Sequence, residues 1–192
     1  MILPIVAYGH SVLREVAKNI DADHPQLDKL IEDMWETMYS SNGVGIAAPQ
    51  VNRLIRLFLV DSTQIFEGLE EDEKKKYPDA PGIKQVFINA KIRSLNGEEW
   101  PYNEGCLSIP KVREDVMRPE EVELEFQDEQ FQTYVKKFNG ITARVILHEY
   151  DHIEGKLFID HISLLKRKLI KSKLDDISKG KVRVDYRMLF PK

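Results

Sequence analysis

The sequence predicts one α+β domain spanning residues 1–192, and three observations support this fold class. The chain has 192 residues, the length of a single domain with a proper core. Helix-like and strand-like segments follow one another without the regular alternation of a doubly wound sheet. No internal repeat and no change of composition marks a boundary between domains.

The first predicted helix covers residues 27–39. Apolar side chains recur in it at intervals of three and four residues, which is the period of one helix face. These side chains are Leu27, Leu30, Ile31, Met34, Trp35, Met38 and Tyr39. Asp23 or Pro25 is the expected start, and Asn42 and Gly43 lie just past the end. We expect the apolar face to pack in the core.

The next segment, residues 43–50, reads GVGIAAPQ and indicates a tight turn of small residues. A predicted strand over residues 54–60 follows it. Residues 67–81 are a charge run closed by prolines, which is typical of a solvated loop or a short exposed helix. A second strand is predicted over residues 85–92, followed by a turn at Gly97.

Two further strands are predicted over residues 122–126 and 133–138, where apolar and polar residues alternate as in a hairpin. A helix is predicted over residues 141–154, with Gly155 at its C-cap. Its first seven residues are almost continuously apolar. We therefore expect this helix to be buried and packed among antiparallel strands.

The last predicted elements are a basic helix over residues 164–177 and a final extended strand over residues 182–188. The helix carries Lys166, Arg167, Lys168, Lys171 and Lys173. The expected architecture is therefore a buried central helix among strands, then a basic helix, then an extended end.

Composition excludes several classes of protein. The chain is 42% hydrophobic and 31% charged, with a formal net charge of -4, so direct nucleic-acid binding is not expected. No apolar run approaches the roughly 20 residues that a membrane-spanning helix needs. No secretory signal is recognisable, and a single cysteine cannot form an intramolecular disulfide. We expect a soluble protein of the reducing cytoplasm.

The buried helix contains HEYDH at residues 148–152. His148 and His152 stand at positions i and i+4, so one helix face can present both imidazoles to one metal ion. Glu149 lies beside them, where a carboxylate can move a proton. This is the pattern of a metal-dependent hydrolase.

A catalytic metal site of this kind needs a third protein ligand. The third histidine of one common pattern is absent, because Phe158 occupies its place. Asp175 and Asp176 lie near the place of a downstream acidic ligand, but in a basic, solvated-looking segment, and His161 is a further candidate. Cys106 remains. A lone cysteine is usually a small core residue, but this one follows a glycine that can let the backbone approach a ligand.

Three segments resemble the signature motifs of the peptide deformylase family of the bacterial type. They are GVGIAAPQ at 43–50, EGCLS at 104–108 and HEYDH at 148–152, and they occur in the family's order and spacing. The resemblance implies a hydrolase that removes the formyl group from the N-terminal formyl-methionine of newly synthesised polypeptides.

The resemblance also implies a ligand set for the metal. Cys106, His148 and His152 would bind one divalent ion, with water in the fourth position. In this family the ion is usually Fe2+, and Zn2+, Ni2+ or Co2+ can occupy the site. The donor set of two imidazoles and one thiolate would suit zinc equally well.

The family's mechanism maps onto residues of this chain. Hydroxide on the metal would attack the formyl carbon, and Glu149 would take the proton of the water and pass it to the leaving amine. The side-chain amide of Gln50 and the backbone N–H of Leu107 would stabilise the oxyanion.

Substrate contacts follow from the same resemblance. Backbone groups would bind the peptide like an added strand, and these belong to Val44, Gly45 and Gly105. The methionine side chain would enter an apolar pocket made by Ile46, Ile141, Val145 and the ring of His148.

Other charged residues have expected places near this site. Glu104 should pair with Arg113 or Arg118 and so hold the cysteine loop. Arg144 would either rim the pocket or extend to solvent. The segment 62–84 is longer than in compact family members and could lie over one edge of the cleft.

The expected partners are N-formyl-methionyl nascent polypeptides, and the family is usually monomeric. Some members dock on the ribosome through a C-terminal helix, so docking through the basic helix is a hypothesis for this chain. Two other functions are open. A zinc metallopeptidase would need a third ligand downstream of His152, and none is convincing. A non-catalytic, metal-stabilised ribosome-binding module would need a closed site with four protein ligands.

Overall fold

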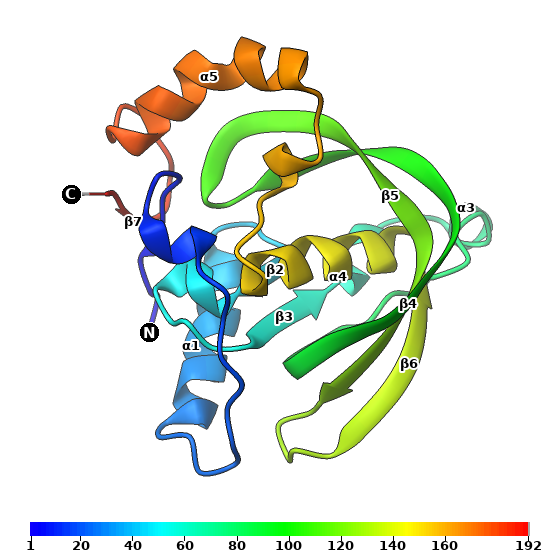
Figure 1. The fold of residues 1–192 in the computed structure, drawn as a ribbon. Coiled ribbons are helices and arrows are strands. Elements are labelled where there is room, and N and C mark those ends of the chain that lie inside the picture. Colours follow the sequence, from blue (N-terminus) through cyan, green and yellow to red (C-terminus); the bar gives the residue numbers. More distant parts are fainter. Residues whose placement is uncertain (192) are drawn as a thin grey trace.

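The computed structural model describes residues 1–191 and shows an α+β fold built on one antiparallel sheet (Figure 1). The sheet has the strand order β2-β3-β4-β5-β6, and two short strands, β1 and β7, form a separate parallel pair. The strands are β1 Ile5–Val6, β2 Gly45–Ala47, β3 Leu57–Asp61, β4 Lys84–Cys106, β5 Ile109–Gln127, β6 Thr133–Asn139 and β7 Met188–Leu189. The predicted fold class is confirmed.

The helices lie on both sides of this sheet and at its ends. The α-helices are α1 Leu27–Ser40, α2 Thr63–Phe66, α3 Glu71–Lys74, α4 Gly140–Ile153 and α5 Leu164–Ser178. Three single 3-10 turns are η1 Ser11–Arg14, η2 Ala48–Val51 and η3 Phe158–Asp160. Within residues 1–191, no helix has both the length and the apolar character needed to cross a membrane.

The first predicted helix is confirmed as α1, which begins at Leu27, but the residue expected at its start is wrong. The chain enters through Gln26 in the left-handed conformation, with φ of 57°, so neither Asp23 nor Pro25 caps the helix. Met34 and Met38 are fully buried on its inner face. That face belongs to one apolar cluster with side chains of β3 and β4.

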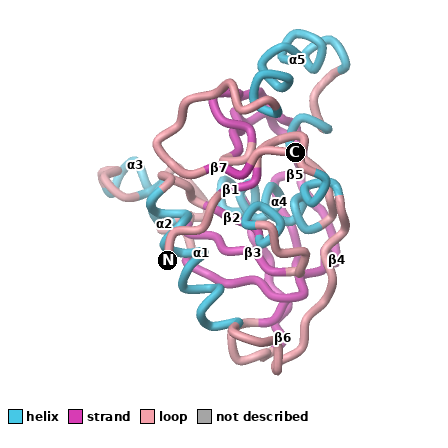
Figure 2. Tube along the Cα trace, turned by 90° about the vertical axis from the view of Figure 1, so that its left-hand side faces the viewer, coloured by secondary structure: helices cyan, strands magenta, loops and turns pink. Residues whose placement is uncertain are grey.

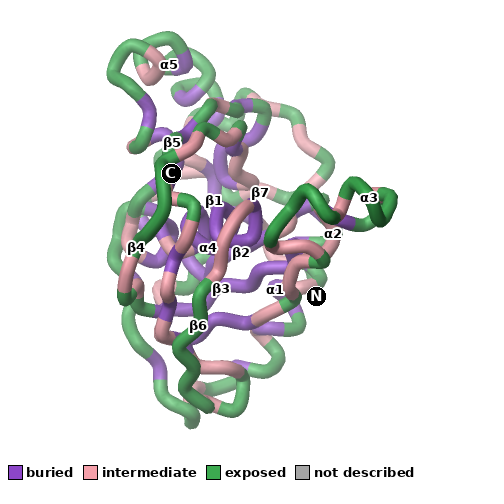
Figure 3. The backbone as a smooth tube through the Cα atoms, turned by 90° about the vertical axis from the view of Figure 1, so that its right-hand side faces the viewer, coloured by how far each residue is buried: buried purple, intermediate pink, exposed green. Residues whose placement is uncertain are grey.

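The small-residue segment 43–50 folds into β2 and the turn η2 at the edge of the sheet. The strand predicted over residues 54–60 begins only at Leu57, because pairing with β4 starts there, opposite Ile88. The charge run at 67–81 contains α3, a short and largely exposed helix, as predicted. Figure 3 shows α3 projecting from the buried centre.

Strands β4 and β5 form one long hairpin, and the predicted turn at Gly97 is wrong. β4 runs through this position without a break. Gly97 has φ of +79° and lies where the pairing register shifts between Asn96 and Glu99, so it belongs to a β-bulge. A Cβ atom there would lie 2.8 Å from Cβ of Glu120. Four such register shifts are distributed along the hairpin and account for its bend.

The hairpin predicted from residues 122–126 and 133–138 is confirmed as the pairing of β5 with β6, in which Val122 faces Phe138. The helix α4 crosses the hollow of the curved sheet (Figure 1). It is buried from Ile141 to Glu149, as its apolar sequence predicts. The C-cap residue is Glu154, and the predicted glycine, Gly155, lies one position beyond it with φ of +68°, the left-handed conformation that often ends a helix.

The basic helix is confirmed as α5, which lies on the outside of the molecule beside β5 (Figures 1 and 2). The final strand is mostly wrong: only Met188 and Leu189 form β7, and residues 182–187 are outside any strand. Strand structure needs a partner, and β1 offers only Ile5 and Val6 for pairing.

Candidate active site

Three side chains of α4 point toward the end of the β4–β5 hairpin. His148, Glu149 and His152 are 9%, 4% and 1% exposed. The two histidines are one helical turn apart, and the centroids of their rings lie 5.2 Å from each other. The helix therefore presents both imidazoles on one buried face.

Cys106 approaches these histidines from the other side, at the end of β4. Its Sγ atom lies 3.2 Å from Nε2 of His152. One donor atom from each of Cys106, His148 and His152 lies within 4.8 Å of the other two. A thiolate and two imidazoles suit a divalent transition metal, and three protein donors leave one position for water. These residues fit a catalytic metal site.

One buried polar atom beside the converging donors supports this fit. Within residues 1–191, Oε2 of Glu149 has no hydrogen-bond partner. Buried polar atoms in folded proteins are nearly always satisfied, so such atoms point to a missing partner in the site. An unpaired carboxylate oxygen beside converging metal donors is suited to accept a proton from water.

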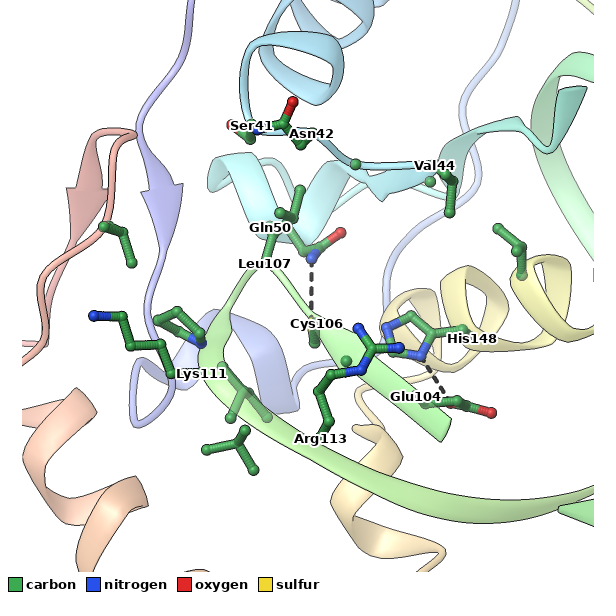
Figure 4. A pocket seen from close by; sticks show the side chains of 18 of the residues that line it. Ser41, Asn42, Val44, Gln50, Glu104, Cys106, Leu107, Lys111, Arg113 and His148 are labelled. Carbon is green, nitrogen blue, oxygen red and sulfur yellow. Dashed lines mark hydrogen bonds and ion pairs between the residues drawn. The ribbon is translucent and has the colours of Figure 1, made fainter. Parts of the chain in front are cut away.

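A buried ion-pair network stands behind His148. Arg118 donates to both carboxylate oxygens of Glu104, from Nε at 2.7 Å and from Nη2 at 3.0 Å. The same arginine donates from Nη1 to Asp151 at 2.7 Å. Oε2 of Glu104 lies 2.9 Å from Nδ1 of His148, visible as a dashed line in Figure 4. This contact holds the imidazole proton on Nδ1, so Nε2 keeps its lone pair for a metal.

The network settles two expectations about arginines. Arg113 does not pair with Glu104 and instead donates from Nε to the side chain of Asn103 at 2.8 Å. Arg144 borders the cavity, as one of its two expected places requires, but it does not extend to solvent, because it is only 2% exposed. Its guanidinium donates to the backbone carbonyls of Trp100 at 2.6 Å and Val116 at 3.0 Å. The long hairpin wraps around α4 and supplies these acceptors, which the helix pattern alone did not reveal.

Replacing Arg118 with methionine should lower the free energy of unfolding by about 3 kcal/mol or more, because two buried carboxylates lose their shared cation. The matched control is Arg93→Met, which removes a surface pair with Glu125 and should cost less than about 1 kcal/mol. Urea unfolding at neutral pH measures both values. Equal losses in the two variants would contradict a structural role for the buried network.

The difference in stability between the wild-type protein and Arg118→Met should depend on pH. Burial raises the pKa of Glu104, but its hydrogen bonds with His148 and Arg118 outweigh burial and hold the pKa well below the ordinary value. A carboxyl with a depressed pKa in the folded state stabilises the protein at neutral pH, and this stabilisation is lost as the pH falls. The stability difference between the wild-type protein and Arg118→Met should therefore narrow in acid.

Cys106 and Glu149 also have shifted pKa values. Burial raises the pKa of the Cys106 thiol, but the nearby imidazoles of His152 and His148 outweigh burial and lower it to about 5. Cys106 is then a thiolate at neutral pH, the form that binds metal. Burial raises the pKa of Glu149 to about 7, against the attraction of the two imidazoles. Such a carboxyl can both take and give a proton near neutral pH.

The turn η2 places Gln50 opposite Cys106 (Figure 4). Its Oε1 atom accepts a hydrogen bond from the N–H of Ala47 at 2.8 Å, so the Nε2 side of the amide faces the cysteine loop. Nε2 lies 3.5 Å from Sγ of Cys106 and 3.4 Å from Oγ of Ser108. The amide therefore directs its donor into the site.

Gln50, Cys106, His148 and Glu149 border one cavity of about 740 Å³, and His152 lies outside its lining. The lining includes the predicted residues Val44, Gly45, Gln50, Gly105, Cys106, Leu107, Val145, His148 and Glu149. Ile46 and Ile141 were expected in the methionine pocket but are not in the lining. Side chains alternate along a strand, so Ile46 points away from the cavity into the cluster beneath β2. Ile141 lies one turn before Val145, at the beginning of α4.

Several lining residues were missed by the sequence reasoning. They are chiefly Ile65, Tyr102, Lys111, Arg183 and Tyr186. Ile65 belongs to the 62–84 segment, so only the start of that segment reaches the cleft edge. Apolar and polar residues alternate over 182–190, and this pattern could have predicted that residues 183–186 form a wall of the cavity.

The edge strand β2 offers backbone groups to the cavity at one residue only. The carbonyl of Val44 accepts from the N–H of Asp61 at 2.9 Å, so it faces β3. Hydrogen-bonding direction alternates along an antiparallel strand, and Gly45, opposite Val60, therefore directs its N–H and C=O away from β3. A Cβ atom on Gly45 would lie 2.5 Å from Oε1 of Glu149, so only glycine leaves room for the carboxylate.

The other candidate metal ligands are occupied or remote. Nε2 of His161 lies 2.8 Å from Oδ2 of Asp151. Asp175 and Asp176 are on α5, and neither belongs to the group of converging donors found within residues 1–191.

Comparison with known proteins identifies close relatives. The family model described as "Polypeptide deformylase" matches residues 2–168. A protein of Christiangramia forsetii named peptide deformylase is 53% identical over 193 residues, covering 100% of this chain and 97% of the relative. One of Flavobacterium johnsoniae with the same name is 54% identical over 192 residues, covering 99% and 96%.

Solved structures agree with these relatives. The crystal structure of a peptide deformylase from Legionella pneumophila has a TM-score of 0.78 at 33% identity and covers 95% of this chain and 99% of its own. A mutant of Arabidopsis thaliana peptide deformylase 1B has a TM-score of 0.80 at 28% identity, with coverage of 96% and 97%. The likeness thus extends over nearly the whole fold.

Proposed function

From the premise that this chain belongs to the polypeptide deformylase family, we propose how its residues carry out the family's reaction. The enzyme is a hydrolase that removes the formyl group from the N terminus of newly synthesised polypeptides. The observation that carries the proposal is the convergence of Cys106, His148 and His152 beside the unpaired carboxylate oxygen of Glu149.

We assign one divalent metal ion to the donors of Cys106, His148 and His152. When bound, it supplies a Lewis acid that lowers the pKa of water and polarises the formyl oxygen. We expect Fe2+ in the cell, with Zn2+, Ni2+ or Co2+ able to occupy the same donors. Metal analysis of protein purified without air tests this assignment.

Glu149 is the proposed proton carrier. Its carboxylate accepts a proton from the attacking water and delivers it to the amine nitrogen as the C–N bond of the formyl amide breaks. The products are formate and a peptide with an unblocked N terminus. Its pKa of about 7 in the buried site suits both halves of this transfer.

The oxyanion formed during attack needs donors that are already in place. We propose the Nε2 group of Gln50, held by the bond between its Oε1 atom and Ala47, and the backbone N–H of Leu107. Leu107 lies in the turn directly after Cys106 and borders the same cavity.

The peptide would bind along the open edge of β2. Gly45 directs its backbone groups toward the cavity, and Val44 and Gly105 form the neighbouring walls. We propose that Val145 and Ile65 contact the methionine side chain, with the ring of His148 at the end of the pocket. Ile46 and Ile141 are buried but lie outside the cavity lining, so we do not assign them to this pocket.

A formate-release assay on formyl-Met-Ala-Ser separates this function from its alternatives. A deformylase releases formate and leaves the peptide bonds intact. A zinc metallopeptidase would cleave internal peptide bonds, and a non-catalytic ribosome-binding module would do neither. Absence of formate release from metal-loaded protein would overturn the proposed function.

The partners are formylated nascent chains, and we propose that α5 docks the enzyme on the ribosome. Leu164, Leu165 and Leu169 are 75%, 69% and 74% exposed on this basic helix. We further propose that the whole chain, residues 1–192, works as a single catalytic domain, as a monomer in the cytoplasm.

Replacing Lys166, Lys168, Lys171 and Lys173 with glutamine should abolish co-sedimentation with ribosomes at low salt, because docking on RNA depends on such charges. Activity on the short peptide should not change. The matched control neutralises Lys74, Lys75 and Lys76 at α3. Unchanged co-sedimentation of the α5 variant would exclude docking through this helix.

A further inference from the structure

The segment after α5 returns to the body of the protein and forms one wall of the catalytic cavity. It is fixed by β7, where the N–H of Ile5 donates to the carbonyl of Arg187 and the N–H of Ala7 to that of Leu189, both at 2.8 Å. Figure 4 shows this parallel pair at the side of the cavity. The inward side chains pack on an apolar core cluster, and they are Val182, Met188 and Phe190.

Tyr186 extends from this wall to the turn that follows Cys106. Its hydroxyl donates to the carbonyl of Leu107 at 2.7 Å. Tyr186 also lines the cavity, together with Arg183, Val184 and Asp185. Burial and the nearby Cys106 raise the pKa of Tyr186, so the phenol stays protonated and remains a donor.

The turn that Tyr186 contacts does not fix its own shape. Cys106 and Ile109 face each other in the hairpin, so Leu107 and Ser108 form a two-residue turn. Such turns usually rely on residues with positive φ, such as Asn-Gly, but neither Leu107 nor Ser108 has a positive φ. The turn is held from outside instead: the N–H of Tyr8 donates to the carbonyl of Ser108 at 2.8 Å, and Tyr186 binds the carbonyl of Leu107.

We propose that Tyr186 is a positioning residue for catalysis, which holds the Leu107 turn so that the Leu107 N–H points at the developing oxyanion. The inference rests on the proposed function and on the donor role of Leu107 within it. It gives the chain's last segment a part in the reaction, beyond its packing on β1. A donor aimed before the reaction costs no reorganisation when charge develops.

The variant Tyr186→Phe tests this inference because it removes one oxygen atom and keeps the ring. On formyl-Met-Ala-Ser, kcat should fall about five- to tenfold, the usual weight of one hydrogen bond, while KM and metal content stay the same. The matched control is Tyr77→Phe, which removes a hydroxyl near α3, away from the cavity lining, and should not change kcat.

A second measurement does not depend on turnover. Amide hydrogen exchange at Leu107 and Ser108 should be faster in Tyr186→Phe, with the rest of the protein unchanged. If kcat stays within twofold of wild type and exchange is unchanged, the positioning role is wrong, although wild-type deformylation still stands. If the wild-type protein releases no formate, the proposed function itself fails, and the exchange result alone then decides whether Tyr186 holds the turn.

Discussion

Glu149→Gln is expected to lower kcat on formyl-Met-Ala-Ser by about a hundredfold to ten-thousandfold, the usual contribution of a positioned acid–base group. Glutamine has the same shape as glutamate but cannot carry the proton from water to the amine. The substitution removes no metal donor, and Oε2 has no hydrogen-bond partner within residues 1–191 that it would disturb. Metal content and thermal stability should therefore match those of wild type.

The measurement is the steady-state rate of formate release from formyl-Met-Ala-Ser. The metal content of the same samples is measured alongside it. Glu154→Gln is the matched control: it lies at the end of the same helix, pairs with Arg56 at 2.7 Å, and lies outside the cavity lining. Near-wild-type activity of metal-loaded Glu149→Gln would remove Glu149 from the mechanism. A comparable loss in both variants would point to a general effect on α4.

Cys106→Ser should weaken metal binding by more than about a hundredfold, since losing even a residue that only orients a ligand costs tenfold to a hundredfold. Serine keeps the size of the side chain but stays protonated at neutral pH, whereas the pKa of the Cys106 thiol is lowered to about 5. The protein should leave gel filtration with little metal and no deformylase activity.

Metal content per chain is the primary readout, and the thiolate charge-transfer absorption of the Co2+-loaded protein is the second. Ser108→Ala, two residues along in the same turn, should keep both the metal and the absorption band. If Cys106→Ser binds metal as tightly as wild type, Cys106 is not a ligand. The third donor must then be sought elsewhere.

The sequence predicted those parts of the site that depend on local geometry. His148 and His152 share a face because the helix repeat fixes their relation, and the long apolar run before them predicts burial. Cys106 was the candidate ligand left after the other patterns failed, and the motif resemblance then implied its role, because no periodicity relates a hairpin turn to a distant helix. Val145 on α4 borders the cavity. Ile46 on β2 does not, because its side chain lies on the other face of the strand, in the apolar cluster with α1.

The features that the sequence could not predict depend on how the strands pair. Arg113 and Arg118 are equivalent in the sequence, and only the strand register turns Arg118 inward to Glu104. Gly97 is a residue typical of turns. Because β5 pairs with β4 on both sides of it, Gly97 lies in a β-bulge instead. The sequence around Tyr186 did not predict its role. Its position depends on the pairing of β7 with β1, which lie near opposite ends of the sequence.

The three proposed metal donors lie on two separate parts of the fold. Cys106 ends a strand, whereas His152, 46 residues later, lies on the helix that this strand curves around. An ion that needs all three donors binds the folded chain and not the unfolded one, so it adds to folding stability by mass action. The gain is about 4 kcal/mol when the ion is a thousandfold above its dissociation constant. In a metal-poor cell the same chain is easier to unfold. The rate at which the protein is degraded then depends on the metal supply.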